Sequence, residues 1–131
     1  MPKPQHVAAA TAVFEDGWNH ARFEGLERAF AASFRFHVHG EGRPMTLDDL
    51  RRIVARWHER VPGFRFELHD VVADGDRVAI RATLRGTRPA PAEGTFAVDH
   101  MFLFRFEHDR IVEVYEVLDS AEMRTALAPA D

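Results

Sequence analysis

The stretch TFAVDHMFLFRFEHDRIVEVYEVL, residues 95–118, decides the fold. Apolar and polar side chains alternate through both halves of it, as they do in strands with one buried face. The segment Glu107-His108-Asp109 separates the halves and predicts a hairpin of two long strands, Thr95–Phe106 and Arg110–Leu118. The two apolar stripes are Val98, His100, Phe102, Phe104 and Phe106 on the first strand and Val112, Val114, Glu116 and Leu118 on the second.

Each stripe has one polar interruption, and the pairing of the strands brings the two together. A three-residue loop with Asp109 in the left-handed region sets His100 opposite Glu116. A two-residue loop would set Phe104 against Glu113 and place the stripes on opposite faces, so burial favours the longer loop. We therefore expect an imidazole and a carboxylate about 5 Å apart at Cβ, close enough to share a hydrogen bond or one substrate proton.

Upstream of this hairpin, the chain predicts three helices, one short strand and a second hairpin. Thr46 and Asp49 resemble a capping box, and the helix that they open ends before Pro62-Gly63. The expected elements are a helix from Gln5 to Asn19-His20, a shorter helix over 23–30, a strand over 33–39, the capped helix, and strands over 64–72 and 77–85. After the last hairpin, a short helix is expected through Leu127. Helices on one face of an antiparallel sheet define an α+β domain, here a single one over residues 1–131.

Composition narrows the classes of function. The 131 residues suffice for one buried core, and 11 Phe against one Tyr indicate an interior poor in aromatic hydroxyls. A net charge of −4 without a basic block argues against nucleic acid and against anionic membranes as partners. Cysteine is absent, which excludes disulfides and thiolate chemistry. The start of the chain lacks an apolar signal core and no stretch reaches the roughly 18 apolar residues of a membrane span, so we expect a cytoplasmic protein.

Short sequence patterns along the chain resemble those of the SnoaL-like family of the nuclear-transport-factor-2-like superfamily. Residues 75–87, GDRVAIRATLRGT, are similar to its third-strand pattern, and residues 104–113 to its last hairpin. Residues 14–30 are similar to its opening, a helix that ends in an aromatic-Asn pair and precedes a second helix. The resemblance covers nearly the whole chain. It implies a curved antiparallel sheet with three N-terminal helices forming a cone around a pocket.

The resemblance also implies a site. In the cyclases of this family an acidic residue on the last strand drives aldol ring closure, and Glu116 matches it, as Glu where the prototype has Asp. His100 matches a polar pocket residue on the neighbouring strand. The predicted ligand contacts around this pair are Phe14, Val38, His39, Trp57, Phe102 and Leu118.

Two functions remain open at this stage. The first is cofactor-independent acid/base chemistry on a small apolar carbonyl compound, namely aldol cyclisation, isomerisation or dehydration, with Glu116 moving the proton and His100 polarising oxygen. The alternative is a non-catalytic module that binds a small molecule or a partner. In such a module the imidazole and the carboxylate would only serve as hydrogen-bond partners for each other.

Two enzymes of the same fold fit less well. Ketosteroid isomerase uses a Tyr and two Asp residues, and the matching positions here hold Phe14, Val38 and Phe102. Three polar groups become three apolar ones, which argues against that activity. The Asp-Arg-Asp set of limonene-type epoxide hydrolases cannot be assembled on inward positions.

A metal site is not expected. His37 and His39 stand at spacing i, i+2, but alternation puts both opposite the apolar face of their strand, and a bulge would be needed to add Glu116 or His100 as a third ligand. His39, at the end of the strand, can still reach the rim of the pocket.

The outer face of the sheet is expected to be amphipathic. Arginines alternate with apolar residues on the predicted strands, and Met101, Leu103, Tyr115 and Val117 lie among them. Such a face predicts a homodimer formed through the outer side of the sheet.

Overall fold

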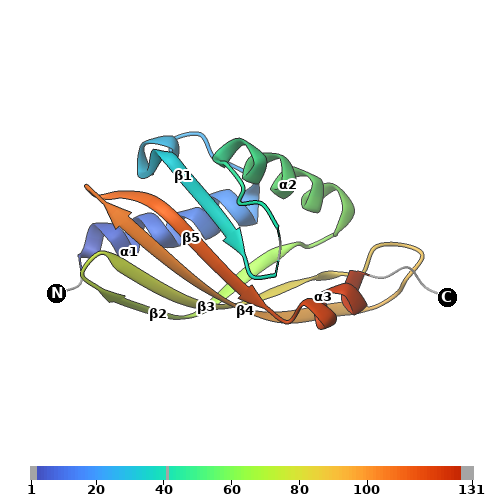
Figure 1. Ribbon diagram of the computed structural model, residues 1–131. Coiled ribbons are helices and arrows are strands. Elements are labelled where there is room, and N and C mark those ends of the chain that lie inside the picture. Colours follow the sequence, from blue (N-terminus) through green and yellow to red (C-terminus); the bar gives the residue numbers. More distant parts are fainter. Residues whose placement is uncertain (1–2, 41, 128–131) are drawn as a thin grey trace.

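The computed structural model describes residues 3–40 and 42–127, and its strands form one open, curved sheet in the order β1-β5-β4-β3-β2 (Figure 1). Strands β2 to β5 make an antiparallel meander, whereas β1 pairs with β5 in parallel. Helices α1 and α2 lie over the same face of the sheet (Figure 1), which confirms the α+β class. The elements are α1 Pro4–Ala12, η1 Val13–Trp18, η2 Glu27–Ala29, β1 Phe30–Val38, α2 Leu47–Arg60, β2 Arg65–Asp74, β3 Arg77–Thr87, β4 Thr95–Glu107, β5 Arg110–Leu118 and α3 Ser120–Leu127.

The first predicted helix is present, with a change of winding in its second half. Pro4 opens α1, where its missing N–H costs nothing, and the chain continues into a π-helical turn, η1. Phe14 and Trp18 are both buried on the inner side of this wider turn. Single π turns within helices are frequent at functional sites.

The short helix predicted over 23–30 is wrong. The segment is a turn followed by the single 3-10 turn η2, because Gly25 adopts a φ of 84° that no continuous helix allows. Phe23 and Leu26 are nevertheless buried, as the apolar spacing predicted. The strand expected from Ser33 begins three residues earlier, at Phe30.

Helix α2 begins as its sequence predicts. The Thr46 side chain accepts a hydrogen bond from the backbone N–H of Asp49 at 3.2 Å, and the Asp49 carboxylate accepts one from the backbone N–H of Thr46 at 3.0 Å. This reciprocal capping box satisfies two N–H groups that the first turn leaves without partners. At the other end of the chain, the Asp119 carboxylate accepts from the backbone N–H of Glu122 and caps α3.

The last hairpin is confirmed, but its register differs from the prediction. Its turn has two residues, His108 and Asp109, both with positive φ, so that Glu107 faces Arg110. A β-bulge then adds Val112 to β5 between the Phe106–Ile111 and Arg105–Glu113 pairs. The bulge brings both stripes back to one face, which a two-residue turn alone would not do. Glu116 therefore faces Phe102.

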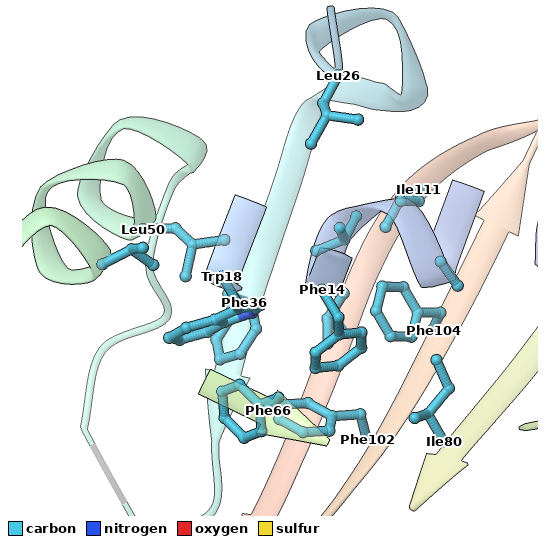
Figure 2. Close-up of a cluster of buried hydrophobic side chains, with 14 of the residues drawn as sticks. Phe14, Trp18, Leu26, Phe36, Leu50, Phe66, Ile80, Phe102, Phe104 and Ile111 are labelled. Atoms are coloured by element: carbon cyan, nitrogen blue, oxygen red, sulfur yellow. The ribbon is translucent and has the colours of Figure 1, made fainter. Parts of the chain in front are cut away.

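The core lies between the inner face of the sheet and the helices. Figure 2 shows the Phe14 ring pointing from η1 toward Phe102 and Phe104 of β4. The centroid of Phe14 is 4.8 Å from that of Phe102 and 5.9 Å from that of Phe104, with the rings edge to face. Removing any of these rings would leave a large void in a close-packed interior.

The outer face of the sheet carries ion pairs and exposed apolar side chains. Arg81 pairs with Asp70 at 2.7 Å and Arg85 with Glu67 at 3.0 Å. Met101 faces Val117 across β4 and β5, and their exposed fractions are 49% and 51%. Among residues 3–40 and 42–127, no helix has the length and apolarity that crossing a bilayer requires.

We propose that two copies of the chain pair through this outer face. Substituting Met101→Lys together with Val117→Glu should yield monomers, because charges do not enter an apolar interface without cost. The two new side chains lie directly opposite and attract each other, so the sheet should stay folded. Analytical ultracentrifugation gives the mass, and far-UV circular dichroism checks the fold.

The matched control is Ala55→Glu, which adds a carboxylate at an exposed position of α2, on the other side of the sheet from the proposed interface. It should leave the mass unchanged. A monomeric parent protein at micromolar concentration would contradict the pairing.

Candidate functional site

A cavity of about 620 Å³ opens between the sheet and the helices. Its volume falls within the range of small-molecule sites, roughly 300–1,000 Å³. Aromatic and aliphatic side chains from helices and strands along the chain make its walls, among them Trp18 of η1, Phe36 of β1, Trp57 of α2 and Phe66 of β2. His100 of β4 and Glu116 of β5 lie on the sheet side of the cavity, which we call its floor. The cavity is therefore a largely apolar space with an imidazole and a carboxyl group at one side.

The two floor residues are buried and in contact. The exposed fractions are 3% for His100 and 7% for Glu116, and the His100 Nε2 atom lies 3.4 Å from Glu116 Oε2. They are diagonal neighbours across the strands, because His100 itself faces Leu118. The contact predicted from the sequence thus exists although the predicted register is wrong, since long side chains reach a diagonal position.

The surroundings of His100 fix its tautomer. Its Nδ1 atom lies 3.0 Å from the backbone carbonyl oxygen of Val98. A carbonyl only accepts, so Nδ1 carries the hydrogen and donates it, and Nε2 of the neutral ring offers a lone pair toward Glu116. Burial lowers the pKa of His100, and it outweighs the hydrogen bond to Val98 and the charge of Asp99, which act in the opposite direction.

Neighbouring rings hold the imidazole in place. The His100 ring stacks on Phe102 with centroids 5.7 Å apart and meets the edge of Phe66 at 5.1 Å. Phe66 is itself fixed by Asn19, whose side-chain amide donates to the Phe66 carbonyl at 3.0 Å and whose amide oxygen accepts from the Phe66 N–H at 2.7 Å. The residue that ends the first helix therefore positions the aromatic wall beside the floor.

The family model for the SnoaL-like domain matches residues 10–114, most of the chain and most of this site. This protein belongs to the SnoaL-like family. No curated protein matches the SnoaL-like chain in sequence.

Solved structures share the fold of this SnoaL-like domain. A proposed SnoaL-like polyketide cyclase from Jannaschia sp. CCS1 is 21% identical with a TM-score of 0.81, over 99% of each chain. IdmH, a proposed polyketide cyclase from Streptomyces antibioticus, is 22% identical with a TM-score of 0.80, over 93% of this chain and 97% of that one. An NTF2-like protein of unknown function from Burkholderia pseudomallei is 17% identical with a TM-score of 0.79, over 96% and 99%. At these identities the likeness is one of fold.

The predicted ligand contacts divide into two groups. Val38, Trp57 and Leu118 line the cavity. Phe14 and Phe102 do not; they are buried in the core, where they pack edge to face, and Phe102 stacks on the His100 ring. His39 is exposed beyond the end of β1 and is not part of the lining either.

The cavity lining also includes residues that the sequence did not predict, in the segment before α2 and in α3. Arg43 and Met45 contribute from the segment before α2, and Met123 and Arg124 from α3. No periodicity marks these positions, because the first pair lies in a loop and the second in a short helix. The one available signal was the chain order, which returns α3 to the sheet directly after the strand of Glu116.

His37, the other conspicuous histidine, lies on the outer face. Its Nε2 is 2.9 Å from Glu113 Oε2 and its ring stacks on Tyr115 at 4.6 Å. Hydrogen bonds from Tyr115, Arg105 and His37 lower the pKa of Glu113 to about 2. In the part of the chain that the structure describes, no three side chains gather as ligands for a metal ion.

The lowered pKa of His100 makes stability depend on pH in this SnoaL-like domain. The unfolded chain holds more protons at this position than the folded one, so this contribution is complete above the unfolded pKa of about 6.5 and declines as the pH falls below it. Substituting His100→Gln should therefore reduce the loss of unfolding free energy between about pH 7.5 and pH 5. Urea denaturation at several pH values measures the free energy of unfolding.

His39→Gln is the control, since that side chain is exposed. It should reproduce the pH dependence of the parent protein. If the free energy of unfolding changed with pH equally in the parent and in His100→Gln, then His100 would not change its pKa on folding.

Proposed function

We propose that this protein is a cofactor-independent acid/base enzyme that enolises a small, largely apolar carbonyl compound, as a step of aldol cyclisation, isomerisation or dehydration. One observation carries the proposal. A buried imidazole and a buried carboxyl group lie 3.4 Å apart at the floor of an apolar cavity of about 620 Å³. Perturbed ionisable pairs in clefts are candidates for catalysis because proton transfer needs groups that change charge near neutral pH.

The pair is suited to hold one proton between its two atoms. With Nδ1 committed to Val98, the neutral His100 ring offers only a lone pair to Glu116, and an ionised carboxylate would repel that lone pair. A single proton shared by Nε2 and Oε2 removes this repulsion.

The shared proton supports a balanced enolisation. With the proton on Oε2, the Glu116 carboxylic acid donates it to the carbonyl oxygen of the substrate while the lone pair of His100 Nε2 takes the proton from the α-carbon. The C–H electron pair becomes the C=C bond of the enol, and the carbonyl π pair goes to oxygen. The pair ends as protonated His100 and ionised Glu116, so it still holds one proton and is ready to return it to another carbon. These roles reverse those expected from the sequence, because Nδ1 of the neutral ring is committed to Val98.

The relatives agree with this choice of chemistry. Two of the similar structures are proposed polyketide cyclases. At 21% and 22% identity they share the fold with this chain, so the reaction and the substrate are argued from this pocket's own residues.

A binding module without catalysis is the second candidate. The apolar walls favour it, because Trp18, Phe36 and Trp57 alone would retain an apolar ligand. In that case the floor pair would only orient the ligand, and the two candidates differ in whether a proton is exchanged.

Substituting Glu116→Gln tests the proposal. The parent protein in D₂O should exchange the α-protons of a small bicyclic ketone such as 2-tetralone above the buffer rate, which proton NMR follows. The variant should lose about 10²- to 10⁴-fold of that enhancement, the usual contribution of a positioned group that transfers a proton. Circular dichroism should show an unchanged fold, since Gln has the size of Glu.

Glu107→Gln is the matched control. It removes a carboxylate from the exposed end of the same hairpin, and exchange should stay at the parent rate. Full exchange activity in Glu116→Gln would refute the catalytic assignment. Ligand binding without exchange in the parent protein would favour the binding module.

A further inference from the structure

Two arginines help to line the cavity from segments far apart in the chain. Arg43 lies between β1 and α2, and Arg124 lies in α3. Both residues are exposed, whereas His100 and Glu116 are buried. The two arginines therefore lie at the solvent-exposed side of the cavity, which we call its mouth.

These two arginines differ from those of the sheet. Arg81, Arg85 and Arg105 each have a carboxylate partner on a neighbouring strand or in their own strand. In the described part of the chain, no carboxylate lies within ion-pair distance of Arg43 or Arg124. Among the described residues, their charges therefore have no ion-pair partner.

The cavity has little negative charge to offset them. Glu116 is the one carboxyl group among the described lining residues, and it is buried at the floor beside His100. The chain as a whole carries a formal charge of −4, so the positive mouth is a local feature and no consequence of overall composition.

We propose that the pocket selects organic anions, that is, molecules with an apolar body and one carboxylate or similar acid group, which Arg43 and Arg124 bind at the mouth. The proposal rests on the function proposed above in that it takes this cavity as the ligand site. A guanidinium presents N–H groups in a fork that matches a carboxylate, and the bond between two charged groups is stronger than one between neutral groups.

The binding of the acid group also orients the substrate. An anion held at the mouth places the apolar body along Trp57 and Phe66 and leaves the far end of the molecule at the floor. A keto acid whose carbonyl is remote from its carboxylate thus presents the carbonyl to the shared proton. The same molecule turned around would bury its charge in an apolar cavity, which is costly.

Two fluorescent probes test the selectivity. Anilinonaphthalene sulfonate and N-phenyl-1-naphthylamine share their ring system and differ in one sulfonate group. Each should bind one site per chain, and each should displace the other, which places both in the same pocket. The double variant Arg43→Gln with Arg124→Gln should weaken the sulfonate probe about tenfold or more and leave the neutral probe unchanged within about twofold. Salt should weaken only the sulfonate probe.

Arg56→Gln provides the matched control, because Arg56 is an exposed residue of α2 outside the cavity lining. It should bind both probes as the parent does. Equal weakening of the two probes in the double variant, or no weakening of the sulfonate probe, would overturn the anion selectivity and leave the acid/base proposal standing. Failure of the parent to bind either probe would instead count against the cavity as a ligand site, and so against the proposed function.

Discussion

The bulge in β5 is the constraint on which the rest of the structure depends. The two-residue turn at His108 and Asp109 is a favourable way to reverse a twisted strand, but alone it would set the two apolar stripes on opposite faces. One extra residue, Val112, corrects the alternation, and Ile111 and Val112 are both buried as a result. The inner face can then pack against the helices, and Glu116 turns toward the cavity.

That same correction forces a carboxyl group and an imidazole into the interior. Removing ionisable groups from water is unfavourable unless they find partners, and an apolar residue at either position would pack at lower cost. His100 and Glu116 offset part of this cost through each other and through the Val98 carbonyl. Outward residues of the same hairpin show the contrast, since Glu113 is stabilised by Arg105 and Tyr115 at a half-exposed position. The floor pair thus interrupts the apolar pattern of the sheet at the place where the sheet borders the cavity.

Much of this could be predicted from the sequence because its determinants are local. The capping box of Thr46 and Asp49 and the alternation of β4 act over a few residues, and each produced the expected element. The failures involve non-local choices. The sequence around Gly25 fits a helix equally well, but Gly25 has a positive φ in the folded chain. The bulge at Val112 competes with a longer turn that would also place both apolar stripes on one face. Arg43 and Arg124 follow no period, so only the folded chain brings them to one mouth.

The orientation of the floor depends on a residue that never reaches it. The Asn19 side chain forms hydrogen bonds with both the N–H and the carbonyl of Phe66. These bonds connect the end of the first helix to the edge strand β2 of the sheet. Phe66 in turn lies edge to face with the His100 ring, while Phe102 stacks on its face. An imidazole held by two rings and one hydrogen bond has little freedom left, so its lone pair keeps one direction whether or not a ligand is bound. The apolar core thus does two things at once: it stabilises the fold, and it orients the group that exchanges the proton.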